Sequence, residues 1–178
     1  MALEEKTYTI DDIYALPDGQ RAELIDGKMY MMTPPTTRHQ RIVLFLSRKI
    51  ADYIDAKGGD CEVFVSPFAV FLETESTTNY VEPDLAVVCD PGKIDERGCH
   101  GAPDWVIEVV SPSTKGMDYG RKQLLYFTAG VREYWVVDPA REVVIVYQAS
   151  EEWMPTFWRF RESIPVGIYG GDLLVTIS

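Results

Sequence analysis

Hydrophobic and polar residues follow two different periods along this chain of 178 residues. Between residues 37 and 57 apolar side chains recur every three or four positions, which predicts one long helix that Gly58 and Gly59 would end. A short helix is expected over residues 10–16 and a further one over 117–129. Alternating or continuous apolar stretches predict strands, which we expect at 22–25, 28–32, 61–73 (broken near Pro67), 84–89, 104–110, 133–137, 142–148, 156–161 and 173–177.

Turn-forming residues divide these elements. The dipeptide Asp26-Gly27 joins the first two strands and predicts a hairpin with a two-residue turn. The polar residues 74–79 and the Gly-, Pro- and charge-rich residues 90–103 predict connections at the surface. The order of a hairpin, a helix, strands, a second helix and further strands predicts a single mixed α/β domain over residues 1–178, built on a central mixed sheet.

Composition narrows the class of protein. No apolar run approaches the roughly 20 residues that cross a bilayer, and the first residues, MALEEKTYT, lack the pattern of a secretory signal. The three cysteines, Cys61, Cys89 and Cys99, are odd in number and lack Cys-x-x-Cys spacing, which predicts free thiols in a reducing cytoplasm. Only His39 and His100 could serve as imidazole ligands, so a zinc site is not expected.

The formal charge of −11 argues against a general nucleic-acid coat protein, because phosphate binding is driven by Lys and Arg. A local exception lies between Arg38 and Lys57, where five basic residues outnumber two acidic ones. This stretch belongs to the long predicted helix. It is either a solvated helix face with balanced charges or a surface that contacts a nucleic-acid backbone.

Candidate chemistry gathers around two strands. Asp84 opens one predicted strand, and Glu108 shares a face of another with Val106 and Val110. Since a carboxylate among valines is costly to bury, a metal ion or a basic side chain must compensate Glu108. Lys122, on the following helix, is a candidate for that cation.

Simpler roles remain open for each candidate residue. Asp84 could open or cap a strand, and Glu108 with Lys122 could form only a structural ion pair. Tyr126, one helical turn after Lys122, could line a site or simply pack as an aromatic side chain. Glu23 could have no more than a cross-strand partner in the hairpin.

Five segments together resemble the Uma2 family, also called DUF820, which is placed in the PD-(D/E)xK restriction-endonuclease-like superfamily. They are ELIDG at 23–27, EPDLAVV at 82–88, WVIEVVSPST at 105–114, DYGRKQLLY at 118–126 and REYWVVDP at 132–139. The resemblance covers most of the chain. It implies a core of a helix, three strands, a helix and a strand, with the hairpin before it and more strands after it.

The resemblance also implies roles for single residues. Asp84 matches the metal-binding aspartate of the Pro-Asp motif, and Glu108 matches the second metal-binding acid. The superfamily motif places a lysine two residues later, where this chain has Val110, so Lys122 is the candidate for a lysine displaced onto the next helix. Glu23 resembles a further family acid. His39 stands where the family often has a polar residue at the start of the first helix, and its role stays open.

The function implied by the resemblance is a Mg²⁺- or Mn²⁺-dependent endonuclease that hydrolyses DNA and works as a homodimer. The alternative is an inactive nucleic-acid-binding or protein-interaction module that keeps the fold; the charge of −11 and Val110 favour it. Aromatic residues near the C-terminus would either form the dimer interface or complete the core: Trp153, Phe157, Trp158, Phe160 and Tyr169.

Overall fold

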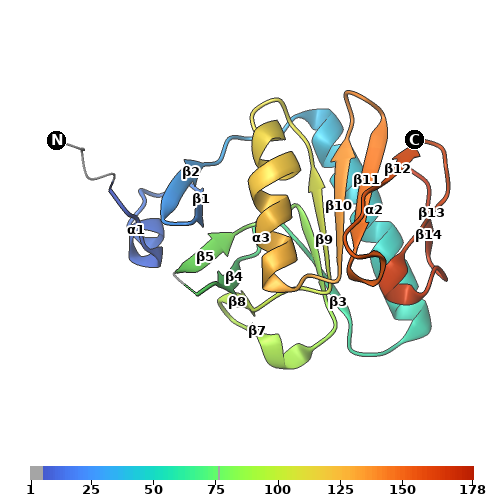
Figure 1. Cartoon of the computed structure of the whole chain (residues 1–178), viewed down its shortest axis with the longest axis horizontal. Coiled ribbons are helices and arrows are strands. Elements are labelled where there is room, and N and C mark those ends of the chain that lie inside the picture. Colours follow the sequence, from blue (N-terminus) through green and yellow to red (C-terminus); the bar gives the residue numbers. More distant parts are fainter. Residues whose placement is uncertain (1–5, 76) are drawn as a thin grey trace.

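Two six-stranded mixed sheets organise the structure, a computed structural model that describes residues 6–75 and 77–178 (Figure 1). The first, called here the N-terminal sheet, has the order β2-β1-β5-β4-β8-β7, and the second, the central sheet, has the order β12-β11-β10-β9-β6-β3. Strands β13 (Ile164–Pro165) and β14 (Leu174–Val175) form a separate pair.

The central sheet carries the expected core. Its strands are β3 (Glu62–Val65), β6 (Leu85–Val88), β9 (Trp105–Val109), β10 (Glu133–Asp138), β11 (Val143–Gln148) and β12 (Thr156–Arg159). Strand β6 is antiparallel to β3 and β9, whereas β10 is parallel to β9 and is reached through helix α3 (Lys122–Ala129). With helix α2 (Thr37–Lys57), the order of a helix, three strands, a helix and a strand implied by the resemblance is present.

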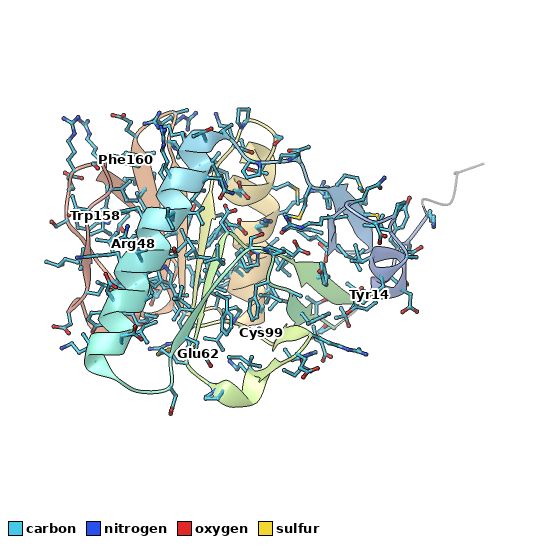
Figure 2. All side chains as sticks on the ribbon, turned by 180° about the vertical axis from the view of Figure 1, so that it is seen from behind. Tyr14, Arg48, Glu62, Cys99, Trp158 and Phe160 are labelled. Atoms are coloured by element: carbon cyan, nitrogen blue, oxygen red, sulfur yellow. A yellow bond between two sulfur atoms is a disulfide. The ribbon has the colours of Figure 1, made fainter. Side chains whose placement is uncertain are left out.

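The two helices cover opposite faces of the central sheet, as Figures 1 and 2 show from opposite sides. Apolar residues of α2, among them Leu46 and Ile50, pack against Trp105 and Ile107 of β9. On the other face, Leu125 and Tyr126 of α3 pack in the cluster that contains Val106. Since side chains alternate along β9, Glu108 points to the α3 side. The periodicity argument thus placed α2 correctly, with its predicted bounds.

The N-terminal sheet was only partly predicted. The hairpin β1 (Ala22–Ile25) and β2 (Lys28–Met31) is present as expected, after the short helix α1 (Ile10–Tyr14). The remaining strands are β4 (Val70–Glu73), β5 (Thr78–Val81), β7 (Ile94–Asp95) and β8 (Gly98–His100).

Two expected connections are therefore wrong in part. Thr78 and Asn79 of the expected link belong to β5, where the polar Asn79 can be fully buried because its side-chain amide accepts from Asp26 N and donates to Leu72 O. Residues 90–103 contain β7 and β8, which are too short to show a period in the sequence. The single strand expected at 61–73 splits at Pro67, and its halves enter different sheets.

The helix expected over 117–129 begins as a π-helical turn, Met117–Arg121, before α3. Lys122 N donates to the carbonyl of Met117, five residues back, and this wider turn sets which side chains face the sheet. Leu124 and Phe127 are exposed, at 61% and 50%, while Lys122 is 3% exposed.

The expectation of free cysteines is wrong for two of the three. Cys61 and Cys89 form a disulfide. Strands β3 and β6 pair antiparallel with Glu62 opposite Val88, so the residues just outside this pair, Cys61 and Cys89, face each other. Sequence spacing cannot show this, because strand register alone brings the two thiols together. The cysteine argument for a reducing compartment no longer holds. Cys99 is a buried free thiol, and burial raises its pKa to about 11.

The aromatic residues near the C-terminus mostly complete the core. Trp153 and Phe160 are buried, and Trp158 and Tyr169 pack against the same core cluster as α2; Figure 2 shows Trp158 and Phe160 beside this helix. Phe157 alone of the five is largely exposed, at 67%. These side chains therefore give the homodimer little support, and it stays a prediction. Within residues 6–75 and 77–178, no helix is both long and apolar enough to span a membrane.

Candidate active site

One cavity of about 530 Å³ collects the predicted residues. Four of the residues that line it are Glu23 of β1, Asp84 directly before β6, Glu108 of β9 and Lys122 of α3. His39, in the first turn of α2, lies on its wall as well. The residues that line the cavity thus come from the hairpin of the N-terminal sheet, from one end of the central sheet and from the N-terminal ends of α2 and α3. Figure 1 shows where these elements lie.

Asp84 is held by two hydrogen bonds on one oxygen. Its Oδ2 accepts from Val109 N at 2.7 Å and lies 3.0 Å from His39 Nε2. Strands β6 and β9 pair Leu85 with Ile107, so the next residues outward, Asp84 and Glu108, are cross-strand neighbours. The sequence argument left the role of His39 open. In the structure His39 is buried: its backbone N donates to the Thr36 side chain, and its ring contacts Asp84.

Glu108 is buried and bound by two side chains of α3. Its Oε1 accepts from Lys122 Nζ at 2.9 Å and from the Tyr126 hydroxyl at 2.8 Å. Because residues four apart lie on one helix face, Lys122 and Tyr126 reach the same carboxylate. Tyr126 therefore both packs in the core and binds Glu108.

Lys122 is the centre of an acidic cluster. Its Nζ lies 2.9 Å from Glu23 Oε1 and 3.8 Å from Asp118 Oδ1, in addition to its bond with Glu108. Glu23 Oε1 also accepts from the backbone N of Glu82, two residues before Asp84. Three carboxylates thus surround one ammonium, and the cluster is two positive charges short when all of them are ionised.

Burial and charge shift the pKa values of this cluster in different directions. Burial raises the pKa of Glu108 well above its ordinary value, against the opposing charge of Lys122. Burial likewise raises the pKa of Asp118 to about 6. Burial alone would lower the pKa of Lys122, but the surrounding carboxylates outweigh it and raise that pKa well above its ordinary value. The ammonium therefore stays charged at neutral pH.

The structure thus brings Glu23, Asp84, Glu108 and Lys122 to one cavity, as the sequence argument required for a common site. Sequence reasoning missed Asp118 as a member of the cluster. Its signal was the spacing of Asp118, Lys122 and Tyr126, each four residues apart, which places all three on one side of a helix. The sequence argument placed Asp118 on this side of the helix but gave it no role in the site.

The donor set suits a hard divalent cation in kind. Mg²⁺ prefers oxygen ligands and usually takes one or two carboxylates, with water and substrate completing its shell. Asp84 and Glu108 offer such carboxylates on adjacent strands of the cavity wall. Across the part of the chain that the structure describes, no group of three or more His, Cys, Asp or Glu side chains is arranged to hold a metal. A cation would thus rely on these two acids, water and substrate.

The fold and the cavity define a mixed α/β protein with an acidic, lysine-containing site. The same fold is seen in a crystal structure from Anabaena variabilis ATCC 29413, described as "a putative nuclease belonging to DUF820". The two chains are 21% identical, the match covers 94% of each, and the TM-score is 0.76, a likeness that shows the fold.

The chain belongs to the Uma2 family, described as "Putative restriction endonuclease", which matches residues 10–164. It is also similar to "Uncharacterized protein slr1290" of Synechocystis sp. strain PCC 6803, with 31% identity over 134 residues. That match spans 75% of this chain and 68% of the relative. The matched region contains every residue of the cavity named above.

Proposed function

We propose that this protein is a metal-dependent endonuclease that hydrolyses DNA phosphodiester bonds in the cavity around Asp84, Glu108 and Lys122. The observation that carries the proposal is that two carboxylates on adjacent strands and one ammonium line a single cavity. Phosphodiester hydrolysis needs an activated water and positive charge close to the phosphate. Membership of a family described as "Putative restriction endonuclease" supports the same reaction class.

Asp84 and Glu108 would hold the cation, Mg²⁺ or Mn²⁺. When bound, such a cation lowers the pKa of a coordinated water and stabilises negative charge on phosphate oxygens. His39 and Val109 N both contact Oδ2 of Asp84 and so fix the orientation of its carboxylate. Tyr126 does the same for Glu108.

Lys122 would supply positive charge next to the reacting phosphate. The standard superfamily lysine would come from the strand position of Val110, which here is buried in the apolar cluster beneath α3. Lys122 approaches from α3 and contacts Glu108 directly. Glu23 holds the ammonium from the hairpin side, which gives this acid a positioning role rather than a place as a metal ligand.

DNA would meet the protein along α2, whose first turn lines the cavity. Arg38 and Lys57 of this helix are occupied by Glu142 and Asp172. The exposed Arg41, Arg48 and Lys49 have no ion-pair partner among the described residues and line a shallow surface hollow on the outer face of α2, where Figure 2 labels Arg48. Unpaired cations on an otherwise acidic protein are the natural contacts for backbone phosphates.

A non-catalytic role is the second candidate, and one observation favours it. Lys122 is buried and bound by two carboxylates, an arrangement that a purely structural ion pair would also show. On this reading the cluster holds the hairpin of the N-terminal sheet against the central sheet. The protein would then bind a partner through its fold without cutting DNA.

Cleavage of supercoiled plasmid DNA, with Mg²⁺ or Mn²⁺ titrated against EDTA, separates the two candidates. We expect metal-dependent nicking by the wild type. In Asp84→Asn the cleavage rate should fall at least about a hundredfold, because removing one group that stabilises charge in a transition state typically lowers the rate by this factor. Asp55→Asn removes an exposed carboxylate of α2 outside the cavity and should cleave normally. Saturable metal binding by calorimetry, lost in Asp84→Asn, should accompany activity. Equal cleavage by both variants, or no metal binding by the wild type, would reject the proposal.

A further inference from the structure

One carboxylate oxygen in the acidic cluster has no hydrogen-bond partner. Asp118 is 1% exposed, and its Oδ1 is buried without a partner among the described residues. A buried polar atom without a hydrogen bond costs free energy, so such atoms are rare and call for an explanation. The closest cation is Lys122 Nζ at 3.8 Å, which is within ion-pair range but too far for a hydrogen bond.

The backbone fixes Asp118 in this position. Its N–H donates to Thr114 O at 3.0 Å, and its carbonyl accepts from the Tyr134 hydroxyl at 2.8 Å. Tyr134 lies on β10 and is fully buried, so this bond ties the π-helical turn to the central sheet. The main-chain path therefore holds Asp118 near Lys122. The lysine has the longer side chain with more rotatable bonds, so it is the member of the pair whose charged group can be repositioned more easily.

Lys122 has the capacity to bind this oxygen. An ammonium has three donors, and two of the close carboxylates, Glu108 and Glu23, lie 2.9 Å away. Moving Nζ by roughly 1 Å toward Asp118 would bring the pair to ordinary hydrogen-bond length. The move would weaken the contact with Glu108, so it has no advantage while Glu108 needs the ammonium.

A divalent cation on Glu108 would reverse that balance. Glu108 Oε1 now accepts from the ammonium, and a metal ion sharing the same carboxylate would repel it at close range. The ammonium then needs another anion within reach that the metal does not use. Asp118 is such an anion, since it does not line the cavity wall where a cation would bind.

We propose that Asp118 is a positioning residue that receives the Lys122 ammonium when a divalent cation binds Glu108. The Lys122 ammonium then has two positions. In the metal-free protein it binds Glu108, in the metal-bound protein it binds Asp118, and in both it keeps its contact with Glu23. The inference rests on the proposed metal site. It adds an explanation of how Glu108 can bind the Lys122 ammonium in the metal-free protein and the cation in the metal-bound protein.

Mn²⁺ affinity measured by calorimetry provides the first test. In Asp118→Asn, Mn²⁺ should bind about tenfold more weakly, the equivalent of one charge-assisted hydrogen bond lost from the bound state. In a Lys122→Met background the same substitution should cost about twofold or less, because Asp118 acts through the ammonium. A loss of the same size in both backgrounds would show that Asp118 acts by its charge alone and would overturn the proposal.

Asp138→Asn is the matched control. Asp138 is also a buried carboxylate close to the π-helical turn, but its oxygens accept from the Tyr119 hydroxyl and from backbone N–H groups of the following turn. It should leave Mn²⁺ affinity unchanged.

A crystal of the wild-type protein soaked with Mn²⁺ gives a readout that needs no variant to fold. The proposal expects Lys122 Nζ within hydrogen-bond distance of Asp118 Oδ1 and withdrawn from Glu108. If Mn²⁺ is bound by Asp84 and Glu108 while Lys122 Nζ still contacts Glu108, the inferred shift of the lysine to Asp118 is refuted and the proposed function is left intact. Absence of Mn²⁺ from the cavity at saturating concentration would reject the metal site itself, and the inference with it.

Discussion

The buried position of Lys122 makes its contribution to stability measurable. Lys122→Met keeps most of the side-chain volume and removes the charge, which leaves Glu108 and Glu23 without their shared cation. Removing one partner of a buried ion pair typically costs 3–5 kcal/mol. A second route gives a similar figure: protonating one carboxyl with an ordinary pKa of about 4.3 at pH 7 costs about 4 kcal/mol. We therefore expect the free energy of unfolding to fall by about 4 kcal/mol.

The same reasoning fixes the pH dependence of this loss. If the variant folds by taking up one proton on Glu108, the penalty should shrink by about 1.4 kcal/mol for each pH unit below 7. At pH 5 the variant should thus be only about 1 kcal/mol less stable than the wild type. Saturating Mg²⁺ should also recover part of the loss at pH 7, because the cation replaces the missing positive charge.

Urea unfolding, followed by the fluorescence of the buried Trp105 and Trp135 and carried out in EDTA at pH 5 and pH 7, measures these differences. Lys57→Met serves as the control, because Lys57 pairs with Asp172 at the surface, where an ion pair contributes no more than about 1 kcal/mol. A Lys122→Met protein as stable as the wild type at pH 7 in EDTA would refute the reasoning. It would mean that solvent already compensates Glu108 and Glu23.

Two further predictions concern Asp118 and the outer face of α2. Because the pKa of Asp118 is raised from 3.8 to about 6, the native state holds a proton that the unfolded chain releases; stability should fall by roughly 3 kcal/mol as pH rises through this window, and urea unfolding of Asp118→Asn should lack that fall. A pH profile identical to that of the wild type would contradict this. Arg41→Glu with Arg48→Glu should weaken DNA binding at least about tenfold and flatten its salt dependence, whereas Arg161→Glu, elsewhere on the surface, should not. Equal anisotropy titrations for both would exclude α2 as the contact.

The sequence predicted the central sheet well because its elements carry their own periodicity. The apolar stripe of α2 and the runs of β9 and β10 specify which face is buried without reference to distant residues. The N-terminal sheet lacks such a signal. Strand β5 contains a buried Asn79 that is acceptable only because Asp26 and Leu72 satisfy its amide, and a pattern of single residues cannot show those partners.

The candidate site divides in the same way. Glu108 could be found because a carboxylate is anomalous within an apolar strand, whereas Asp84, at the start of its strand, was identified mainly through the resemblance to the Pro-Asp motif. The contact of His39 with Asp84 depends on how α2 crosses the sheet, and the cysteine pair depends on the register of β3 with β6. Such contacts arise from tertiary geometry, so periodicity and spacing contain no trace of them.

The position of the lysine follows from which face of the sheet is covered. Glu108 and Val110 point toward α3, and Val110 packs in the apolar cluster with Leu125 and Tyr126. A lysine at 110 would replace a buried valine with an ammonium among apolar side chains, which is costly unless a carboxylate pairs with it. Lys122 instead approaches Glu108 from α3. Its aliphatic chain is buried, and its ammonium lies among three carboxylates. Asp118, in the π-helical turn, and Lys122, just after it, are both buried, so the two side chains face inward together. The chain thus places a cation beside Glu108 from α3 rather than from the strand. What that cation can do chemically depends on its position next to Glu108, and not on whether the lysine follows the acid by two residues in the sequence.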